Sequence, residues 1–241
     1  MADFETISVV ADGPVATLSL NRPDVRNAMN PAMIREITSA FEGFNTSDTI
    51  RVVVLRGEGK VFCAGGDLNW MRDVLGQTEQ EVIDDSRHLL DMYRAINDSP
   101  KLVIAAVEGA AVAEVKIGLV PGIIAAFILP RIGTSWFRYL SKSAVLFDAE
   151  TARTAGLIHE IAGGADDLAR RIDNHIRLGL SASPHAIAET GNLINALGYR
   201  ISEETLDNGL LYNAKARLSD TAQEGISAFL DKRPPPWAMD S

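Results

Sequence analysis

The sequence is poor in the residue types that build disulfide and metal sites. It has one cysteine, Cys63, and only four histidines among 241 residues. A single cysteine excludes an intramolecular disulfide framework and fits a reducing cytoplasm. With no cluster of cysteines and only scattered histidines, a zinc site is not expected.

Long uninterrupted apolar runs are also absent. The longest mainly apolar stretch, at 117–129, contains Gly118, Pro121 and Gly122 and is too short to span a bilayer. The start of the chain, "MADFETISVV", has no basic region followed by an apolar core, so no secretory signal is expected. The net charge of −9 argues against nucleic acid or an anionic membrane as the main partner. It leaves room for a local basic pocket that binds an anionic ligand.

What the chain does have is a large apolar fraction, 46% of residues, arranged first in a strand–helix alternation. "FETISVV" and "VATLSLN" flank Asp12-Gly13-Pro14 and predict a β-hairpin. Asn30-Pro31 predicts the start of a helix. The runs "IRVVVLRG" and "KLVIAAVEG" predict buried strands, and helical spacing covers residues 78–96. This alternation indicates an α/β core with parallel pairing.

The second half changes to helical periodicity. "FDAETARTAG" predicts a short helix that Asp148 caps and Gly156 ends, and "GLIHEIA" predicts one short strand. We therefore expect an α/β core over residues 1–180 and a helical C-terminal region over 181–241. The further helices are expected at 166–180, 184–196, 203–219 and 221–230, before a tail, "DKRPPPWAMDS", that cannot continue a helix.

A small-residue turn, "VFCAGGDLNWM", follows the third expected strand. Ala64, Gly65 and Gly66 allow a ligand to approach the backbone, and N–H groups at the following helix start carry positive partial charge. Such donors bind phosphate, or a carbonyl oxygen that becomes negative during a reaction. The alternative is an ordinary glycine turn with Asp67 as the helix cap, and the spacing alone favours it.

Other candidate residues have equally plain alternatives. Arg22 and Arg26 lie in one loop and suit phosphate binding, although solvated loop cations explain them as well. Trp70, Met71 and Trp136 fit apolar packing better than an acyl pocket. Glu114 stands between apolar segments, either as a surface charge or as a catalytic acid, and Cys63 fits a small buried side chain.

Six segments stand out when they are taken together: "LSLNRPDVRNAMN", "VVVLRGEGKVFCAGGDLNWM", "KLVIAAVEGAAV", "EVKIGLVPG", "AETARTAGLIHEI" and "EGISAFLDKRPPPW". They resemble segments of the crotonase family, the enoyl-CoA hydratase/isomerase family, occur in that family's order and cover nearly the whole chain. The resemblance implies an α/β fold, a crotonase-like spiral of ββα turns with a helical C-terminal trimerisation region. It also implies an acyl-CoA substrate, no separate cofactor because coenzyme A is part of the substrate, and a homo-oligomer that is a trimer or a dimer of trimers.

The resemblance also implies roles for individual residues of the glycine turn. Gly66 would give a backbone N–H to the thioester oxygen, and Glu114 would be the acid that exchanges a proton with the substrate. The carbonyl of Ala64 would meet the adenine amino group. Gly65 and Asp67 flank the donor in the same binding segment.

The remaining family positions would contact coenzyme A. Arg26 would contact a phosphate, and Ala28 would lie beside it through its backbone. Phe229 and Lys232 would approach coenzyme A, often from an adjacent subunit.

The resemblance favours an acyl-CoA hydratase that adds water to a 2-enoyl-CoA. "FCAGGDLNWMR" and "EVKIGLVPG" look most like the branch that hydrates glutaconyl-type esters such as methylglutaconyl-CoA. Double-bond isomerisation on the same scaffold is the nearest alternative, because it needs one proton shuttle and no activated water. A coenzyme A-binding protein without catalysis is the third.

One family segment is absent. Val112 is followed by Ala113 and then Glu114, where the family has a glycine-rich helix start and another strand. By the resemblance, that segment would supply the second oxyanion-hole N–H and, in many hydratases, a second glutamate. Either residues are missing from the chain as written, which the intact flanking motifs favour, or the deletion is real. An intact mass compared with 26.0 kDa distinguishes the two.

Overall fold

The structure is a computed structural model that extends over residues 1–241, and it describes 4–74, 76–108, 114–143 and 145–238. The expectation that residues are omitted between Val112 and Glu114 stays a prediction. The family segment is absent from the sequence as written. The junction lies within 109–113, outside the described residues.

The chain forms two compact units. One unit contains residues 1–65, 91–110 and 158–200. The other contains residues 66–90, 111–157 and 201–241. The division that the sequence predicts near residue 180 stays a prediction.

The first unit is built on a four-stranded sheet in the order β1-β2-β3-β4. β1 (Ile7–Asp12) and β2 (Val15–Leu20) form the expected antiparallel hairpin. Gly13 turns the chain with a φ of 53°, which glycine adopts without strain. β3 (Val52–Gly57) and β4 (Leu102–Ala105) extend the sheet by parallel pairing, as predicted from the strand–helix alternation.

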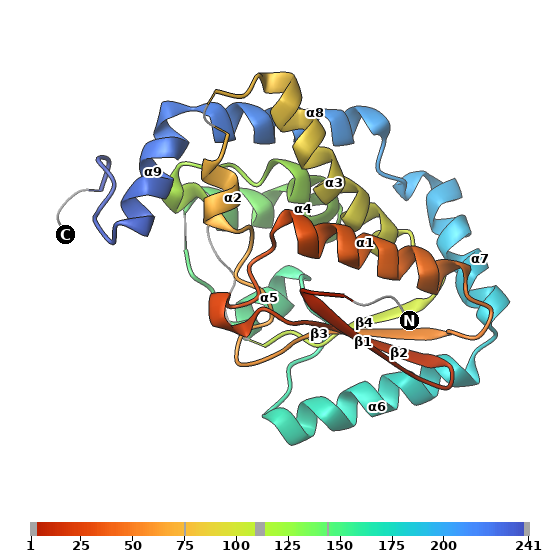
Figure 1. Ribbon diagram of the computed structural model, residues 1–241. Coiled ribbons are helices and arrows are strands. Elements are labelled where there is room, and N and C mark those ends of the chain that lie inside the picture. Colours follow the sequence, from red (N-terminus) through yellow and green to blue (C-terminus); the bar gives the residue numbers. More distant parts are fainter. Residues whose placement is uncertain (1–3, 75, 109–113, 144, 239–241) are drawn as a thin grey trace. The chain divides into compact units, whose positions relative to one another are not determined.

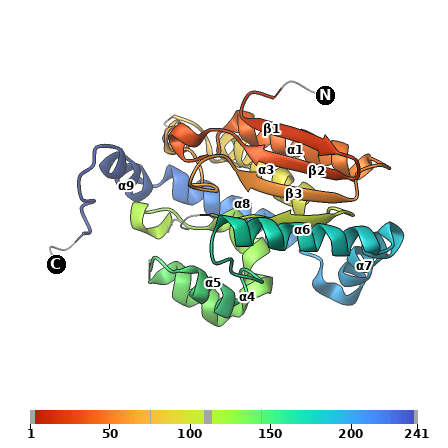
Figure 2. The same cartoon turned by 90° about the horizontal axis from the view of Figure 1, so that it is seen from below.

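Helices cover both faces of this sheet. α1 (Pro31–Thr46) contacts β1, and α6 (Ala165–Ser181) contacts β3 and β4. Figure 1 shows α1 and α6 on opposite sides of the strands, and Figure 2 views the sheet from the side of α6. The Asn30 side chain accepts a hydrogen bond from Met33 N at 2.9 Å, so the predicted helix start is confirmed. The core between these layers includes Leu18, Ile34, Phe41, Val52 and Val53, all nearly without solvent exposure.

The second unit is helical. Its helices include α2 (Leu68–Arg72), the 3-10 helix η2 (Glu114–Ile117), α4 (Gly122–Lys142), α5 (Ala149–Ala155), α8 (Glu203–Leu218) and α9 (Asp220–Leu230). The unit boundary falls inside α3 (Glu79–Asn97). α4 and α8 cross closely because Gly122 and Gly209 bring their backbones together. Gly133, with a φ of 70°, kinks α4.

Most elements agree with the sequence predictions. Asp148 caps α5 and Gly156 ends it with a φ of 84°, both as expected. The predicted helices of the C-terminal part are found as α6, α7 (Pro184–Ile194), α8 and α9, with a π-helical turn, η3 (Asn195–Tyr199), after α7. The tail after α9 is not helical over its described residues.

The strand predicted at "GLIHEIA" is wrong, because residues 156–162 form no strand. Its apolar and polar residues serve separate purposes. Leu157 packs on the apolar cluster of α4 and α5, whereas the Glu160 carboxylate pairs with Arg171 of α6 at 2.6 Å. The alternation that suggested a strand therefore arises from two different contacts. Of the helices that the structure describes, none has the length and apolar character needed to cross a membrane.

Gly179 of α6 tests how closely this helix approaches the sheet. A methyl group there would run into Leu102 Cδ2 and lie 3.4 Å from Val52 Cγ2. We expect Gly179→Ala to be less stable than a glycine-to-alanine change at an open helical position by about 1–3 kcal/mol, because overpacking against Leu102 opposes the helix preference of alanine. The measurement is a urea unfolding curve.

Gly191 of α7 provides the matched control, since a methyl group there meets nothing within 4 Å. Gly191→Ala should raise the free energy of unfolding by about 0.5–1 kcal/mol, because alanine loses less backbone entropy on folding. Equal stabilisation by both substitutions would contradict the close approach of α6.

Candidate active site

The small-residue turn after β3 is held by backbone hydrogen bonds in the first unit. Ala64 N donates to the Arg26 carbonyl at 2.9 Å, and the Gly65 carbonyl accepts from Met29 N at 2.8 Å. Gly65 has a φ of 92°, a conformation that side chains disfavour, so glycine is required there. The loop that carries Arg26 and the turn that carries Ala64 are thus brought together.

The hydrogen bonds of the turn at 64–66 leave the N–H of Gly66 available as a donor. Ala64 N is bonded to Arg26, and Gly65 N points to the Cys63 sulfur at 3.4 Å. Within the described parts of the chain, the Gly66 N–H donates to no acceptor. A side chain at Gly66 would meet Met71 Cε at 2.5 Å, so Met71 closes one side of the turn.

Arg26 and Ala28 lie in a tight loop between β2 and α1. The chain there forms the 3-10 helix η1 (Pro23–Val25), and Arg26 ends it with a φ of 53°. The Arg26 side chain is exposed. The Ala28 carbonyl accepts a hydrogen bond from the Arg22 guanidinium, which fixes the backbone beside Arg26.

Asn27, which the sequence analysis did not single out, is the residue that holds this loop. It is 0% exposed, with a φ of 55°. Its Nδ2 donates to the carbonyls of Glu58 and Val61, at 2.9 and 2.8 Å, and its Oδ1 accepts from Arg22 N at 2.8 Å. Asparagine tolerates this left-handed conformation better than most residues, and its position in a polar loop before a helix was the available signal.

Asp67 takes the structural role that its position predicts. Its side chain accepts from Asn69 N at 3.0 Å and caps α2. α2 has only five residues, too few for a helix to be stable by itself. The peptide of the Gly66 N–H is restrained by its own carbonyl, that of Gly65, which accepts from Met29 N. The orientation of α2 must come from other tertiary contacts.

Those contacts come from an apolar cluster in the second unit, which we call the α9 cluster. Its buried members are Leu119, Ala222 and Ile226, and the partly buried residues packed on it include Leu68 and Met71 of α2 and Ile117 of η2. The cluster therefore places the helix that follows Gly66 and the short helix that begins at Glu114 against the same helix, α9.

Two glycines allow η2 to approach α9 at backbone distance. A methyl group at Gly225 would strike the Ile117 carbonyl, and one at Gly118 would lie 2.8 Å from the Thr221 carbonyl. Gly118 also has a φ of 77°. The end of η2 is thus fixed against the first turns of α9.

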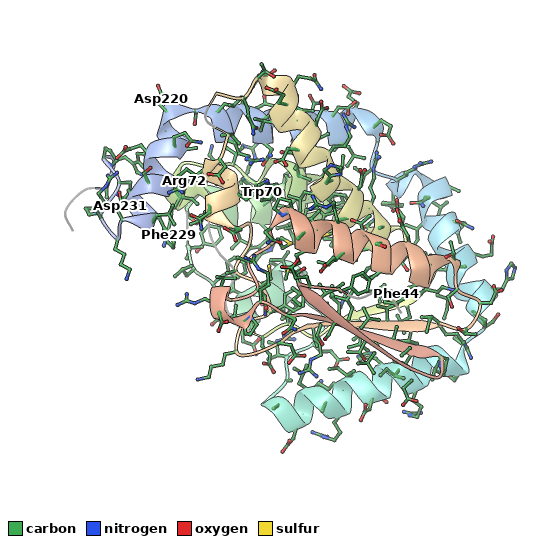
Figure 3. All side chains as sticks on the ribbon, in the orientation of Figure 1. Phe44, Trp70, Arg72, Asp220, Phe229 and Asp231 are labelled. Carbon is green, nitrogen blue, oxygen red and sulfur yellow. The ribbon has the colours of Figure 1, made fainter. Side chains whose placement is uncertain are left out.

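The other predicted residues of the second unit are placed as follows. Glu114 is the first residue of η2, and its side chain lies outside the described part of the structure. Phe229 lies near the end of α9 (Figure 3) and is 60% exposed, which is unusual for a large aromatic side chain. Lys232 lies two residues beyond the end of α9, exposed and with a φ of 54°.

Cys63 is not placed for nucleophilic chemistry. Burial raises the pKa of its thiol, although the backbone of Gly65 opposes the shift. A raised pKa leaves less thiolate at neutral pH. Among the residues with described side chains, there is no group of three or more His, Cys, Asp or Glu residues arranged to hold a metal ion.

Comparisons with known proteins identify the class to which this fold and turn belong. The family model described as enoyl-CoA hydratase/isomerase matches residues 11–240. A 1,2-epoxyphenylacetyl-CoA isomerase of Escherichia coli is 31% identical over 92% of this chain and 94% of its own length. A 2,3-dehydroadipyl-CoA hydratase of the same organism is 29% identical over the same shares.

Solved structures agree with this assignment. An enoyl-CoA hydratase from Shewanella pealeana is 30% identical, with a TM-score of 0.77 over 97% of this chain and 96% of its own. One from Mycobacterium avium is 28% identical, with a TM-score of 0.82 over 97% and 99%. The chain belongs to the enoyl-CoA hydratase/isomerase family and has the crotonase fold.

The alignments also bear on the absent family segment. Those with the two Escherichia coli relatives run over 254 and 252 positions, whereas 92% of 241 residues is only about 222. About thirty positions of each alignment therefore hold no residue of this chain. A shortfall of this kind agrees with a family segment absent from the sequence.

Replacing Asn27 should loosen the loop that carries Arg26. Asn27→Ala leaves two buried carbonyls and one N–H without their partner, which costs about 1–3 kcal/mol of unfolding free energy. Urea unfolding measures the loss. Asn21→Ala, at an exposed position of the same loop, should change the stability by less than about 0.5 kcal/mol. Equal effects of the two substitutions would contradict the role of Asn27.

The raised pKa of Cys63 predicts slow alkylation of the native protein. At pH 8 the native thiol should react with iodoacetamide roughly tenfold more slowly than in the urea-unfolded chain, because less of it is thiolate and burial restricts access. Intact mass against time measures both rates. A native thiol that reacts as fast as the unfolded one would exclude this environment.

Proposed function

We propose that this protein is an acyl-CoA hydratase that adds water to a 2-enoyl-CoA thioester. The observation that carries the proposal is the α9 cluster, which packs the helix after Gly66 and the helix that begins at Glu114 against the same face of α9. The Gly66 N–H supports it, because this donor has no acceptor among the described residues and an oxyanion site needs an available donor fixed in place.

The chemistry needs one donor and one carboxyl group as a minimum. The Glu114 carboxylate takes a proton from water while the water oxygen bonds to C3 of the substrate. The electrons of the C2–C3 double bond move onto the thioester oxygen, where the Gly66 N–H stabilises the negative charge. The protonated Glu114 then delivers its proton to C2, which restores the carbonyl. A fixed donor of this kind is worth about 3–4 kcal/mol in the transition state.

The first unit would hold part of the coenzyme A moiety. The exposed Arg26 guanidinium suits a phosphate, since it presents a fork of donors. The Ala64 carbonyl is proposed to accept from the adenine amino group, beside the Gly65 backbone. Ala28 contributes its backbone. In the second unit, Phe229 and Lys232 offer an exposed ring and a cation that suit coenzyme A.

A homo-oligomer, a trimer or a dimer of trimers, is part of the proposal. Phe229 and Lys232 would then serve the site of a neighbouring subunit. Their exposure in the single chain supports this arrangement, because an aromatic ring that is 60% exposed gains by burial against a ligand or a partner. The branched glutaconyl-type substrate is proposed on the sequences around Gly66 and Glu114.

Isomerisation of an enoyl-CoA is the second candidate, and the absent family segment favours it. By family resemblance, that segment would hold the second oxyanion donor and a second glutamate. Moving a double bond requires one group to take a proton at one carbon and return it at another, whereas hydration also requires water to be activated. A single carboxyl group at Glu114 meets the smaller requirement.

An absorbance assay separates the candidates. We expect loss of the enoyl absorbance with crotonyl-CoA or 3-methylglutaconyl-CoA, and conversion of a 3-enoyl-CoA to the 2-enoyl form without loss would instead indicate an isomerase. Glu114→Gln should reduce turnover by about 10²–10⁴-fold, the usual contribution of a general acid–base group.

Glu150→Gln is the matched control, because Glu150 is an exposed carboxylate of α5 paired with Arg153. It should leave turnover unchanged. Full activity of Glu114→Gln would remove Glu114 from the mechanism. Binding of coenzyme A by the wild type without turnover of any enoyl-CoA would reject both enzymes in favour of a binding protein.

A further inference from the structure

Arg217 of α8 is a buried charge that the proposed mechanism does not use. It is only 1% exposed and is the largest fully buried side chain in the described residues. Removing a guanidinium from water is expensive unless hydrogen bonds and an opposite charge replace its hydration. The partners of Arg217 therefore indicate what its burial achieves.

Those partners lie on two other helices of the same unit. The guanidinium donates through Nη1 to Asp85 Oδ2 at 2.9 Å and to Ser86 Oγ at 3.2 Å, both on α3. Through Nη2 it donates to the Trp70 carbonyl of α2 at 3.1 Å. Its central carbon also lies 4.7 Å from the centroid of the Trp70 ring, within the range of a cation–π contact.

The partners are bonded to one another as well. The Trp70 indole N–H donates to Asp85 Oδ2 at 2.9 Å, so the indole, the carboxylate and the guanidinium form a closed triangle. Asn213 of α8 donates to Ser86 Oγ at 2.9 Å. At the main chain, Gln223 of α9 donates to the Arg217 carbonyl at 2.7 Å. We call Arg217, Asp85, Trp70, Ser86 and Asn213 the Arg217 network.

Stability alone does not explain this arrangement, because apolar residues of similar volume stabilise a buried position as well as an ion pair does, or better. A charged network adds direction, since each hydrogen bond fixes an atom. The atom fixed on α2 is the Trp70 carbonyl. α2 has five residues and begins two residues after Gly66, so one bond at Trp70 restrains the whole helix.

Two kinds of contact thus hold α2 (Figure 3 labels Trp70 on this helix). Leu68 and Met71 anchor it by packing into the α9 cluster, a kind of contact that depends on buried area and little on direction. The Trp70 carbonyl and ring anchor it to Arg217, which fixes its rotation. Asp67 caps the helix, and the Gly66 peptide precedes the cap directly.

We infer that Arg217 is a positioning residue for the reaction. The hydrogen bond from Met29 N to the Gly65 carbonyl restrains the peptide of the Gly66 N–H from the preceding side. By fixing the rotation of α2, Arg217 restrains the chain from the following side and so helps to aim the Gly66 N–H at the thioester oxygen. This inference rests on the proposed function at Gly66. Arg217 touches neither the substrate nor the reacting atoms, and its effect passes through α2.

The first test measures kcat and KM of Arg217→Met by the absorbance assay described above. A displacement of a catalytic group by about 1 Å costs up to about 10²-fold in rate, so we expect kcat to fall at least about tenfold. KM should stay within about twofold, because the coenzyme A contacts lie elsewhere. Arg217→Lys keeps the charge but loses the fork of donors and should recover part of kcat.

A second variant distinguishes a loss of positioning from a loss of folded protein. Arg217→Met combined with Asp85→Asn removes both charges and leaves no carboxylate without its partner. It should lose less stability than Arg217→Met alone, because no carboxylate remains without its partner, yet keep the low kcat. Arg153→Met, at an exposed ion pair of α5, is the control and should change neither parameter. Wild-type kcat in the folded double variant would overturn the inference.

Amide hydrogen exchange over residues 66–72 supplies a readout that needs no turnover. In Arg217→Met and in the double variant, we expect exchange in this segment to accelerate at least about tenfold while α4 keeps its protection. Unchanged exchange would overturn the inference even if the enzyme proved inactive. Faster exchange in a protein without any enoyl-CoA turnover would uphold the positioning of α2 and reject the proposed reaction.

Discussion

Apolar packing on one face of α9 fixes the candidate active site. The two helices that matter, α2 and η2, are each about one turn long and have no independent stability. They hold their places because Leu68, Met71 and Ile117 enter the α9 cluster. The site therefore depends on a helix more than 100 residues later in the sequence, which explains why no local pattern around Gly66 describes it.

Two physical effects with different properties act on this site. The apolar cluster supplies adhesion, which depends on the area buried and little on direction. The Arg217 network supplies direction, because its hydrogen bonds join fixed atoms of α2, α3 and α8. Burial lowers the pKa of the Arg217 guanidinium, against the opposing effect of Asp85, yet arginine remains charged in proteins. The directional restraint is thus present across the physiological pH range.

The sequence predicted what local chemistry determines. Caps such as Asn30 and Asp148 follow from side-chain oxygens before a helix, and the strands follow from short apolar runs, so these predictions are confirmed. Contacts between residues far apart in the sequence could not be predicted in this way. Nothing near Asn27 or Arg217 shows that each is fully buried, because their partners lie tens of residues or more than a hundred residues away. The wrong strand prediction at "GLIHEIA" has the same cause, since Leu157 and Glu160 contact different parts of the chain.

The contact between Gly225 and the Ile117 carbonyl restricts how this part of the protein can change during evolution. With no room for a side chain at that crossing, residue 225 must remain glycine as long as α9 packs against η2. Variation can therefore accumulate in the loops around the turn, while the helix that supports them stays constant.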